Sequence, residues 1–86
     1  MLKKLSDRLT EHEHEGEIVL MSLANGDLFA LDGVAAQAWR LIDGDLDAAA
    51  LKDALAAEYA LERAEISGDV DALIAQMKKA GLLAEN

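Results

Sequence analysis

Two histidines flanked by carboxylates form the densest group of potential metal ligands in this 86-residue sequence. Residues 11–15 read Glu-His-Glu-His-Glu, and in an extended strand His12 and His14 would share one face. Two imidazoles with carboxylate neighbours could hold a divalent metal. The sequence has no cysteine and no third histidine to complete a structural site. Because a run of exposed charges is usually solvated, we favour a solvated acidic strand and expect no metal and no cofactor.

The three serines, Ser6, Ser22 and Ser67, offer little for nucleophilic catalysis. None lies in a Gly-rich nucleophile elbow, and the isolated glycines do not form a phosphate-binding loop. An acyl or peptidyl carrier would need a serine at a helix start, usually within Asp-Ser-Leu, and neither Ser6-Asp7 nor Ser67-Gly68 matches that pattern. We therefore predict that the protein is not an enzyme.

The remaining chemistry is that of the backbone, in a predicted hairpin closed by Asn25-Gly26. An Asn-Gly pair between apolar runs is the strongest short-range hairpin signal, and its tight form requires positive φ at both residues. The predicted strands are 17–24, which is apolar on both faces as a central strand should be, and 27–31. If 27–31 is an edge strand, its unpaired N–H and C=O groups are a template for another chain. The sequence thus predicts a peptide-binding edge.

Three helices are expected to position this edge. The first spans 33–42, with Asp32 as its N-cap, and the second follows the N-cap Asp47. The third is predicted to begin near Ser67, with Asp69 and Asp71 in its first turn, and to end before Gly81. Its buried stripe would consist of Val70, Leu73, Ile74 and Met77, after which Leu82-Leu83 would fold back on the core.

This order of elements predicts an α+β, winged-helix-like fold. A small N-terminal antiparallel sheet of two to three strands, with 9–15 as its least certain strand, precedes the three helices. Residues 1–86 are expected to form a single domain. For residues 1–8 the sequence predicts no definite element, and flexibility there is left open.

The charge balance limits the classes of partner. Seventeen acidic against eight basic residues give a net charge of −9, which opposes nucleic-acid binding because that affinity depends largely on cations. No apolar run approaches the roughly 20 residues that span a bilayer, and no signal-peptide pattern follows Met1. We expect a cytoplasmic protein with neither nucleic acid nor membrane as a partner.

The order and spacing of the apolar and turn residues over 15–84 resemble those of the PqqD-like family, whose members are also called RiPP recognition elements. The carrying residues are Glu17-Ile18-Val19-Leu20, Gly26-Asp27-Leu28-Phe29-Ala30-Leu31-Asp32, Ala36–Trp39, Leu41-Ile42-Asp43-Gly44, Leu51, Leu55, Tyr59, Asp69-Val70, Leu73-Ile74 and Gly81-Leu82-Leu83. Phe29 departs from the pattern, since the family more often has Tyr there, and Asp32 and Asp47 replace other capping residues.

The resemblance implies a non-catalytic peptide chaperone. It would bind the leader segment of a ribosomally synthesised precursor peptide as an antiparallel strand and present it to a modifying enzyme, such as a radical SAM protein or a peptidase. The peptide-binding residues would be Asp27, Leu28, Phe29, Ala30 and Leu31 on the strand and Asp69, Ala72, Leu73, Gln76, Met77 and Ala80 on the third helix. A charged residue at position 29 or 77 should then weaken binding with little change in circular dichroism.

Two alternatives remain open from the sequence. The second and third helices could form a winged-helix regulator that binds DNA or a protein partner, with Gln76, Lys78 and Lys79 as its polar contacts. The chain could also be either a monomer or a weak, edge-paired or domain-swapped dimer in which a second copy occupies the strand edge.

Overall fold

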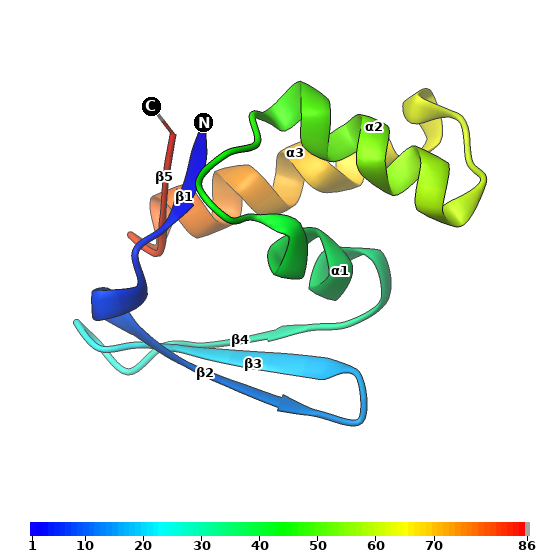
Figure 1. The fold of residues 1–86 in the computed structure, drawn as a ribbon. Coiled ribbons are helices and arrows are strands. Elements are labelled where there is room, and N and C mark those ends of the chain that lie inside the picture. The colour runs from blue at the N-terminus through cyan, green and yellow to red at the C-terminus, as the bar shows by residue number, and fades with distance from the viewer. Residues whose placement is uncertain (86) are drawn as a thin grey trace.

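A computed structural model describes residues 1–85, with a three-stranded sheet along one side of the molecule and three helices along the other (Figure 1). A 3-10 helix, η1, lies between the first two strands. The elements in chain order are β1 (Leu2–Lys4), η1 (Ser6–Arg8), β2 (Leu9–His14), β3 (Glu17–Ser22), β4 (Leu28–Leu31), α1 (Gly33–Leu41), α2 (Ala48–Tyr59), α3 (Arg63–Lys79) and β5 (Leu83–Glu85).

The three-stranded sheet is antiparallel, in the order β2-β3-β4. β3 is central, as its apolar residues on both faces predict. Ile18 and Leu20 point to the helices and have no exposed surface, whereas Val19 and Met21 lie half-buried on the opposite face. The predicted α+β, winged-helix-like arrangement of sheet followed by three helices is confirmed.

The loop between β3 and β4 is longer than the predicted two-residue turn. The Ser22 N–H donates to the Asp27 carbonyl and the Gly26 N–H donates to the Ser22 carbonyl, so residues 23–26 form the loop. Gly26 has φ of +77°, but Asn25 keeps a negative φ. The Asn25 side chain instead accepts a hydrogen bond from the Asp27 N–H at 3.0 Å. The prediction of positive φ at both residues was wrong because this amide closes the turn.

A second sheet joins the two ends of the described chain, where β1 pairs antiparallel with β5. Residues 1–8, for which no element was predicted, therefore contain a strand and a 3-10 helix. Leu2 has no exposed surface, and Leu82 and Leu83 are buried as expected. Pairing with β1 also directs β5 away from β4, whose outer edge carries no further strand within residues 1–85.

The first two helices follow their predicted caps. α1 ends at Leu41, one residue before the predicted end, and Asp32 occupies its N-cap position without a side-chain cap hydrogen bond. Asp47 caps α2 directly, since its Oδ1 accepts from the Ala50 N–H at 2.8 Å. Within residues 1–85, none of the three helices combines the length and apolarity that crossing a bilayer requires.

The third helix begins one turn earlier than predicted. Glu62 and Glu65 form a capping box, in which each side chain accepts from the other's backbone N–H. Ser67 is therefore an internal residue, and Asp69 and Asp71 lie beyond the first turn. The buried stripe of α3 is as predicted and is extended by Ile66: Ile66, Val70, Leu73, Ile74 and Met77.

Candidate peptide-binding groove

A groove runs between the outer edge of β4 and α3. It opens to solvent, has a volume of about 450 Å³ and is lined by the end of β4, the start of α1 and the middle of α3. Its lining residues are Ala30, Leu31, Asp32, Gly33, Val34, Ala35, Asp69, Ala72, Leu73 and Gln76. We call this the main groove.

The hydrogen-bond pattern of β4 shows which of its backbone groups face the main groove. In an antiparallel pair, residues alternate between exchanging hydrogen bonds with the partner strand and pointing those groups away. Ser22 bonds Asp27, and the register pairs Leu20 with Phe29 and Ile18 with Leu31. The N–H and C=O groups of Leu28 and Ala30 therefore point away from β3, toward the free edge.

The floor of the main groove has a small apolar recess between α1 and α3. It has a volume of about 20 Å³ and is lined by Val34, Ala35, Ala38, Asp69, Val70 and Leu73. This volume exceeds the ~10–15 Å³ that a cavity needs to hold one water, but five of the six lining residues are apolar and a water needs two to four polar partners. It is suited to the tip of an aliphatic side chain.

A second cleft of about 270 Å³ continues the main groove toward the C-terminal end of α3. The two share Gln76, whose side chain lies on the exposed face of α3. Phe29 lines this cleft from the sheet and packs against the core, so it contributes to both stability and the groove wall. Asn25, Asp27, Lys79 and Ala80 complete the lining.

Nine of the eleven sequence-predicted peptide-binding residues line one of these two clefts. They come from two segments that are distant in sequence, and the fold brings them together across one groove. These residues are Asp27, Phe29, Ala30, Leu31, Asp69, Ala72, Leu73, Gln76 and Ala80.

The other two predicted residues lie elsewhere. Met77 has no exposed surface and belongs to the core, because α3 directs its side chain between the helices and the sheet. Leu28 is 67% exposed and its side chain lies on the sheet face opposite Phe29, although its backbone faces the edge. A charged residue at position 77 would be buried in the core and should destabilise the fold. The expectation of little change in circular dichroism for such a variant is corrected accordingly.

Sequence reasoning missed the residues that close one end of the main groove, Asp32, Gly33, Val34 and Ala35. They connect the edge strand to α1, and Gly33 has φ of +53°, a conformation that favours glycine. An Asp-Gly pair directly after an edge strand was the available signal. It was interpreted only as a helix cap.

The other chemistry-bearing groups lie on β2, away from the groove. Glu13 accepts a hydrogen bond from the Arg40 Nε at 3.0 Å, which raises the pKa of Arg40. His12 and His14 are exposed, and no group of three or more potential ligands around them could hold a metal ion within residues 1–85.

Comparison with known proteins identifies relatives of the chain and of its fold. A family described as "Coenzyme PQQ synthesis protein D (PqqD)" matches residues 17–83. Two proteins named "PqqA binding protein", from Rhodopseudomonas palustris strains ATCC BAA-98 / CGA009 and TIE-1, are 43% and 41% identical over 63 residues. These matches cover 73% of this chain and 62% of each relative, so the chain spans less than two thirds of the length of those proteins.

Two solved structures share the whole arrangement. "TbiB1 in Complex with the TbiA(beta) Leader Peptide" has a TM-score of 0.81 and 28% identity over 96% of both chains. "Lasso peptide synthetase B1 complexed with the leader peptide" has a TM-score of 0.77 and 25% identity over 98% of both chains. Since the family match covers more than half of the chain, it confirms the resemblance inferred from the sequence: the chain belongs to the PqqD family.

Proposed function

We propose that this protein binds the leader segment of a ribosomally synthesised precursor peptide by β-strand addition to β4. The observation that carries the proposal is the free edge of β4, whose outward backbone groups at Leu28 and Ala30 face a groove walled by α3. Two solved structures of the same fold are complexes with leader peptides, and two sequence relatives are named for binding PqqA. These relatives support leader binding by this fold, and the geometry of the β4 edge supports its assignment to the main groove.

Binding would combine backbone alignment with side-chain selection. The peptide strand would hydrogen-bond to Leu28 and Ala30, and alternate side chains would point toward the main groove. One aliphatic side chain would enter the apolar recess beside Val34 and Leu73. Because the edge is already ordered, most of the entropy cost falls on the peptide. Micromolar affinity requires only about −8 kcal/mol, which a few such anchors supply.

The protein itself would be non-catalytic and would act in the cytoplasm. Its role would be to hold the leader while a separate modifying enzyme acts on the rest of the precursor. A radical SAM protein or a peptidase is the class of enzyme that we propose as the partner. Concentrating the substrate beside such an enzyme raises its effective concentration without any chemistry by the binding protein.

Hydrogen exchange of individual amides tests the proposal. The labelled protein would be titrated with synthetic leader segments of short precursor peptides encoded beside its gene. We expect the N–H groups of Leu28 and Ala30 to become protected on binding, because both acquire a strand partner. The outward N–H groups on the opposite edge of the sheet should exchange at an unchanged rate. Protection that grows with protein concentration in the absence of peptide would instead identify a second copy on this edge.

A matched pair of variants on α3 provides the control. Ala72 and Ala75 are both exposed, but only Ala72 lines the main groove. Ala72→Arg should weaken leader binding at least tenfold by filling the groove, whereas Ala75→Arg should not, and both should fold because Arg and Ala have similar helix propensity. Equal affinity of the two variants for the leader would contradict the proposed site.

A further inference from the structure

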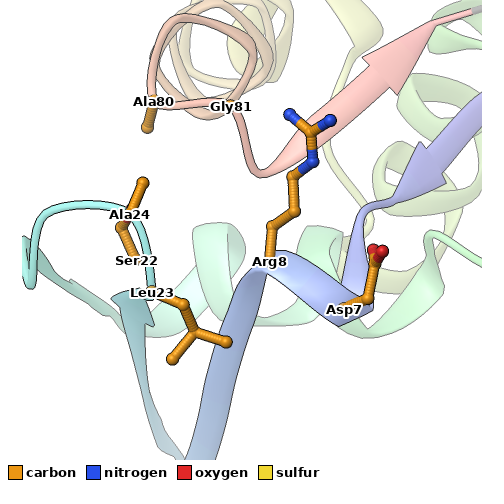
Figure 2. A pocket seen from close by; sticks show the side chains of 7 residues that line it. All are labelled: Asp7, Arg8, Ser22, Leu23, Ala24, Ala80 and Gly81. Atoms are coloured by element: carbon orange, nitrogen blue, oxygen red, sulfur yellow. The ribbon is translucent and has the colours of Figure 1, made fainter.

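The second cleft continues beyond Ala80 into a third one, next to η1 (Figure 2). This third cleft has a volume of about 450 Å³ and lies between η1, the start of the β3–β4 loop and the end of α3. Ala24 and Ala80 face each other across it, and the Arg8 guanidinium extends toward the segment that follows Gly81 (Figure 2). The lining residues are Asp7, Arg8, Ser22, Leu23, Ala24, Ala80 and Gly81.

The cations at this end of the groove lack carboxylate partners. Within residues 1–85, Arg40, Lys52, Arg63 and Lys78 each form an ion pair, but Arg8 and Lys79 do not. Arg8 lines the third cleft and Lys79 lines the second. In a chain with nine excess negative charges, two unpaired cations along one continuous groove are available for an external anion.

Two carboxylates near these cations would oppose an anion: Asp27 lines the second cleft with Lys79, and Asp7 lines the third with Arg8. Asp7 forms no ion pair with Arg8 in the described structure. The C-terminal end of α3 carries partial negative charge. However, the carbonyls of residues 76–78 already accept N–H groups from residues 80–82, which reduces that charge.

The opposite end of the groove has the opposite charge. Asp32 and Asp69 are exposed, line the main groove and form no ion pair within residues 1–85. The unpaired cations Lys79 and Arg8 lie toward the other end, where each shares its cleft with one carboxylate, Asp27 in the second cleft and Asp7 in the third. Because β4 runs from the Lys79 end to the Asp69 end, an antiparallel guest strand would begin beside Asp69 and finish near Arg8.

We infer that the third cleft is a subsite for an acidic residue of the bound peptide, directly C-terminal to the segment paired with β4. This inference rests on the proposed function, since it requires a peptide in the main groove. The carboxylate would pair with Arg8 and be attracted by Lys79, and an adjacent apolar side chain would pack on Leu23, which is 55% exposed. Basic residues would be favoured at the N-terminal end, near Asp69. The charge order of the peptide would thus fix its direction and register.

A displayed library of random 12-residue peptides, each with a β-prone centre, tests this inference. Selection against the wild-type protein should enrich Asp and Glu in the C-terminal third of the peptides. Selection against the double variant Arg8→Glu, Lys79→Glu should enrich Lys and Arg there instead. Lys3→Glu is the matched control, because Lys3 is exposed, forms no ion pair and lines none of these clefts. Its selected peptides should match those of the wild type.

Calorimetry on one selected peptide gives the quantitative readout. Arg8→Glu should weaken binding at least fivefold, and exchanging the peptide's acidic residue for Lys should restore it. Peptides that compete for the main groove, judged by their loss with Ala72→Arg, but that show no charge preference would overturn the subsite and leave the proposed function intact. A library that yields no peptide sensitive to Ala72→Arg would overturn both.

Discussion

The two outer strands of the three-stranded sheet, β2 and β4, differ in almost every property that decides whether an edge accepts another chain. β2 is six residues long and its last four are Glu-His-Glu-His, all exposed. β4 is four residues long, Leu-Phe-Ala-Leu, and carries no charge. α3 faces β4 across the main groove, whereas the two inward carboxylates of β2 are bound by α1: Glu11 by Trp39 Nε1 at 2.9 Å and Glu13 by Arg40 Nε at 3.0 Å.

Charged side chains on an edge oppose pairing, because a second strand would have to desolvate them. β2 is therefore protected against unplanned partners, and its inward carboxylates serve to attach the sheet to α1. β4 lacks that protection, but it is short and α3 restricts what can approach. The comparison indicates that the sheet has one edge protected by charged side chains, at β2, and one edge open to a partner strand, at β4. We call the β2 edge the guarded edge.

Proline substitutions at equivalent positions on the two edges should have the largest difference in effect. The Leu23 N–H donates to the Arg8 carbonyl, so by alternation the Glu13 N–H points outward from β2, as the Ala30 N–H does from β4. Ala30→Pro removes one donor from the binding edge and adds bulk there. We expect a tenfold to hundredfold loss of peptide affinity by calorimetry, about 1.4–2.8 kcal/mol.

Glu13→Pro should change peptide affinity less than twofold, because it alters only the guarded edge. Both variants should remain folded, since proline is tolerated where a strand's N–H faces outward. Melting curves of the two proteins provide the check on folding. A larger loss of affinity for Glu13→Pro than for Ala30→Pro would assign the site to β2 and reverse the comparison.

Trp39→Phe should affect the attachment of β2 and leave the binding edge unchanged. Trp39 has no exposed surface, and its Nε1–H is the donor to Glu11. Losing this bond and part of the ring should cost about 1–3 kcal/mol of unfolding free energy in denaturant titrations. Glu11→Gln keeps an oxygen acceptor and should cost less. Affinity for the peptide should be the same in all three proteins; a parallel loss of affinity would show that the two edges are coupled.

The fold was predictable where a local signal had one physical meaning. The doubly apolar pattern around Ile18 and Leu20 made β3 central, and Asp47 was correctly identified as an N-cap. The start of α3 was missed because Glu62 and Glu65 cap it reciprocally, whereas Ser67 has the residue type usual at a cap. The pairing of β1 with β5 joins three-residue strands from opposite ends of the chain, and no local pattern encodes such a contact.

The candidate groove was predictable to the level of elements but not of every side chain. Alternation along β4 correctly separates Phe29 from Leu28, but it could not show that Leu28 contributes its backbone alone. On α3, Leu73 lines the groove and Met77, one turn later, is fully buried. The difference depends on tertiary packing, because α3 directs the Met77 side chain into the core between the helices and the sheet.

The smallest expected effect concerns Lys4 on β1. Its side chain lies over the ring of Trp39, the α1 residue that donates a hydrogen bond to Glu11 of β2. Its Nζ lies 4.9 Å from the centre of the Trp39 ring. Partial burial lowers the pKa of Lys4 below its ordinary value of 10.5, and the nearby carboxylates of Glu11 and Asp43 oppose that shift without cancelling it. The folded protein thus releases this proton at a lower pH than the unfolded chain does.

Between these two pKa values the unfolded state binds more protons, so stability should rise slightly as the pH approaches 10.5 and fall as the pH is lowered through the folded pKa. Lys4→Met retains the apolar stem without the charge and should lack this rise, because position 4 then has no proton to release. Denaturant titrations of both proteins from pH 8 to 11 isolate the effect, since other groups that titrate there contribute equally to both. A steeper rise of stability with pH in Lys4→Met than in the wild type would mean that the charged ammonium stabilises the contact between β1 and Trp39. The attachment of β2 to α1 would then depend on charge on β1 as well as on β2.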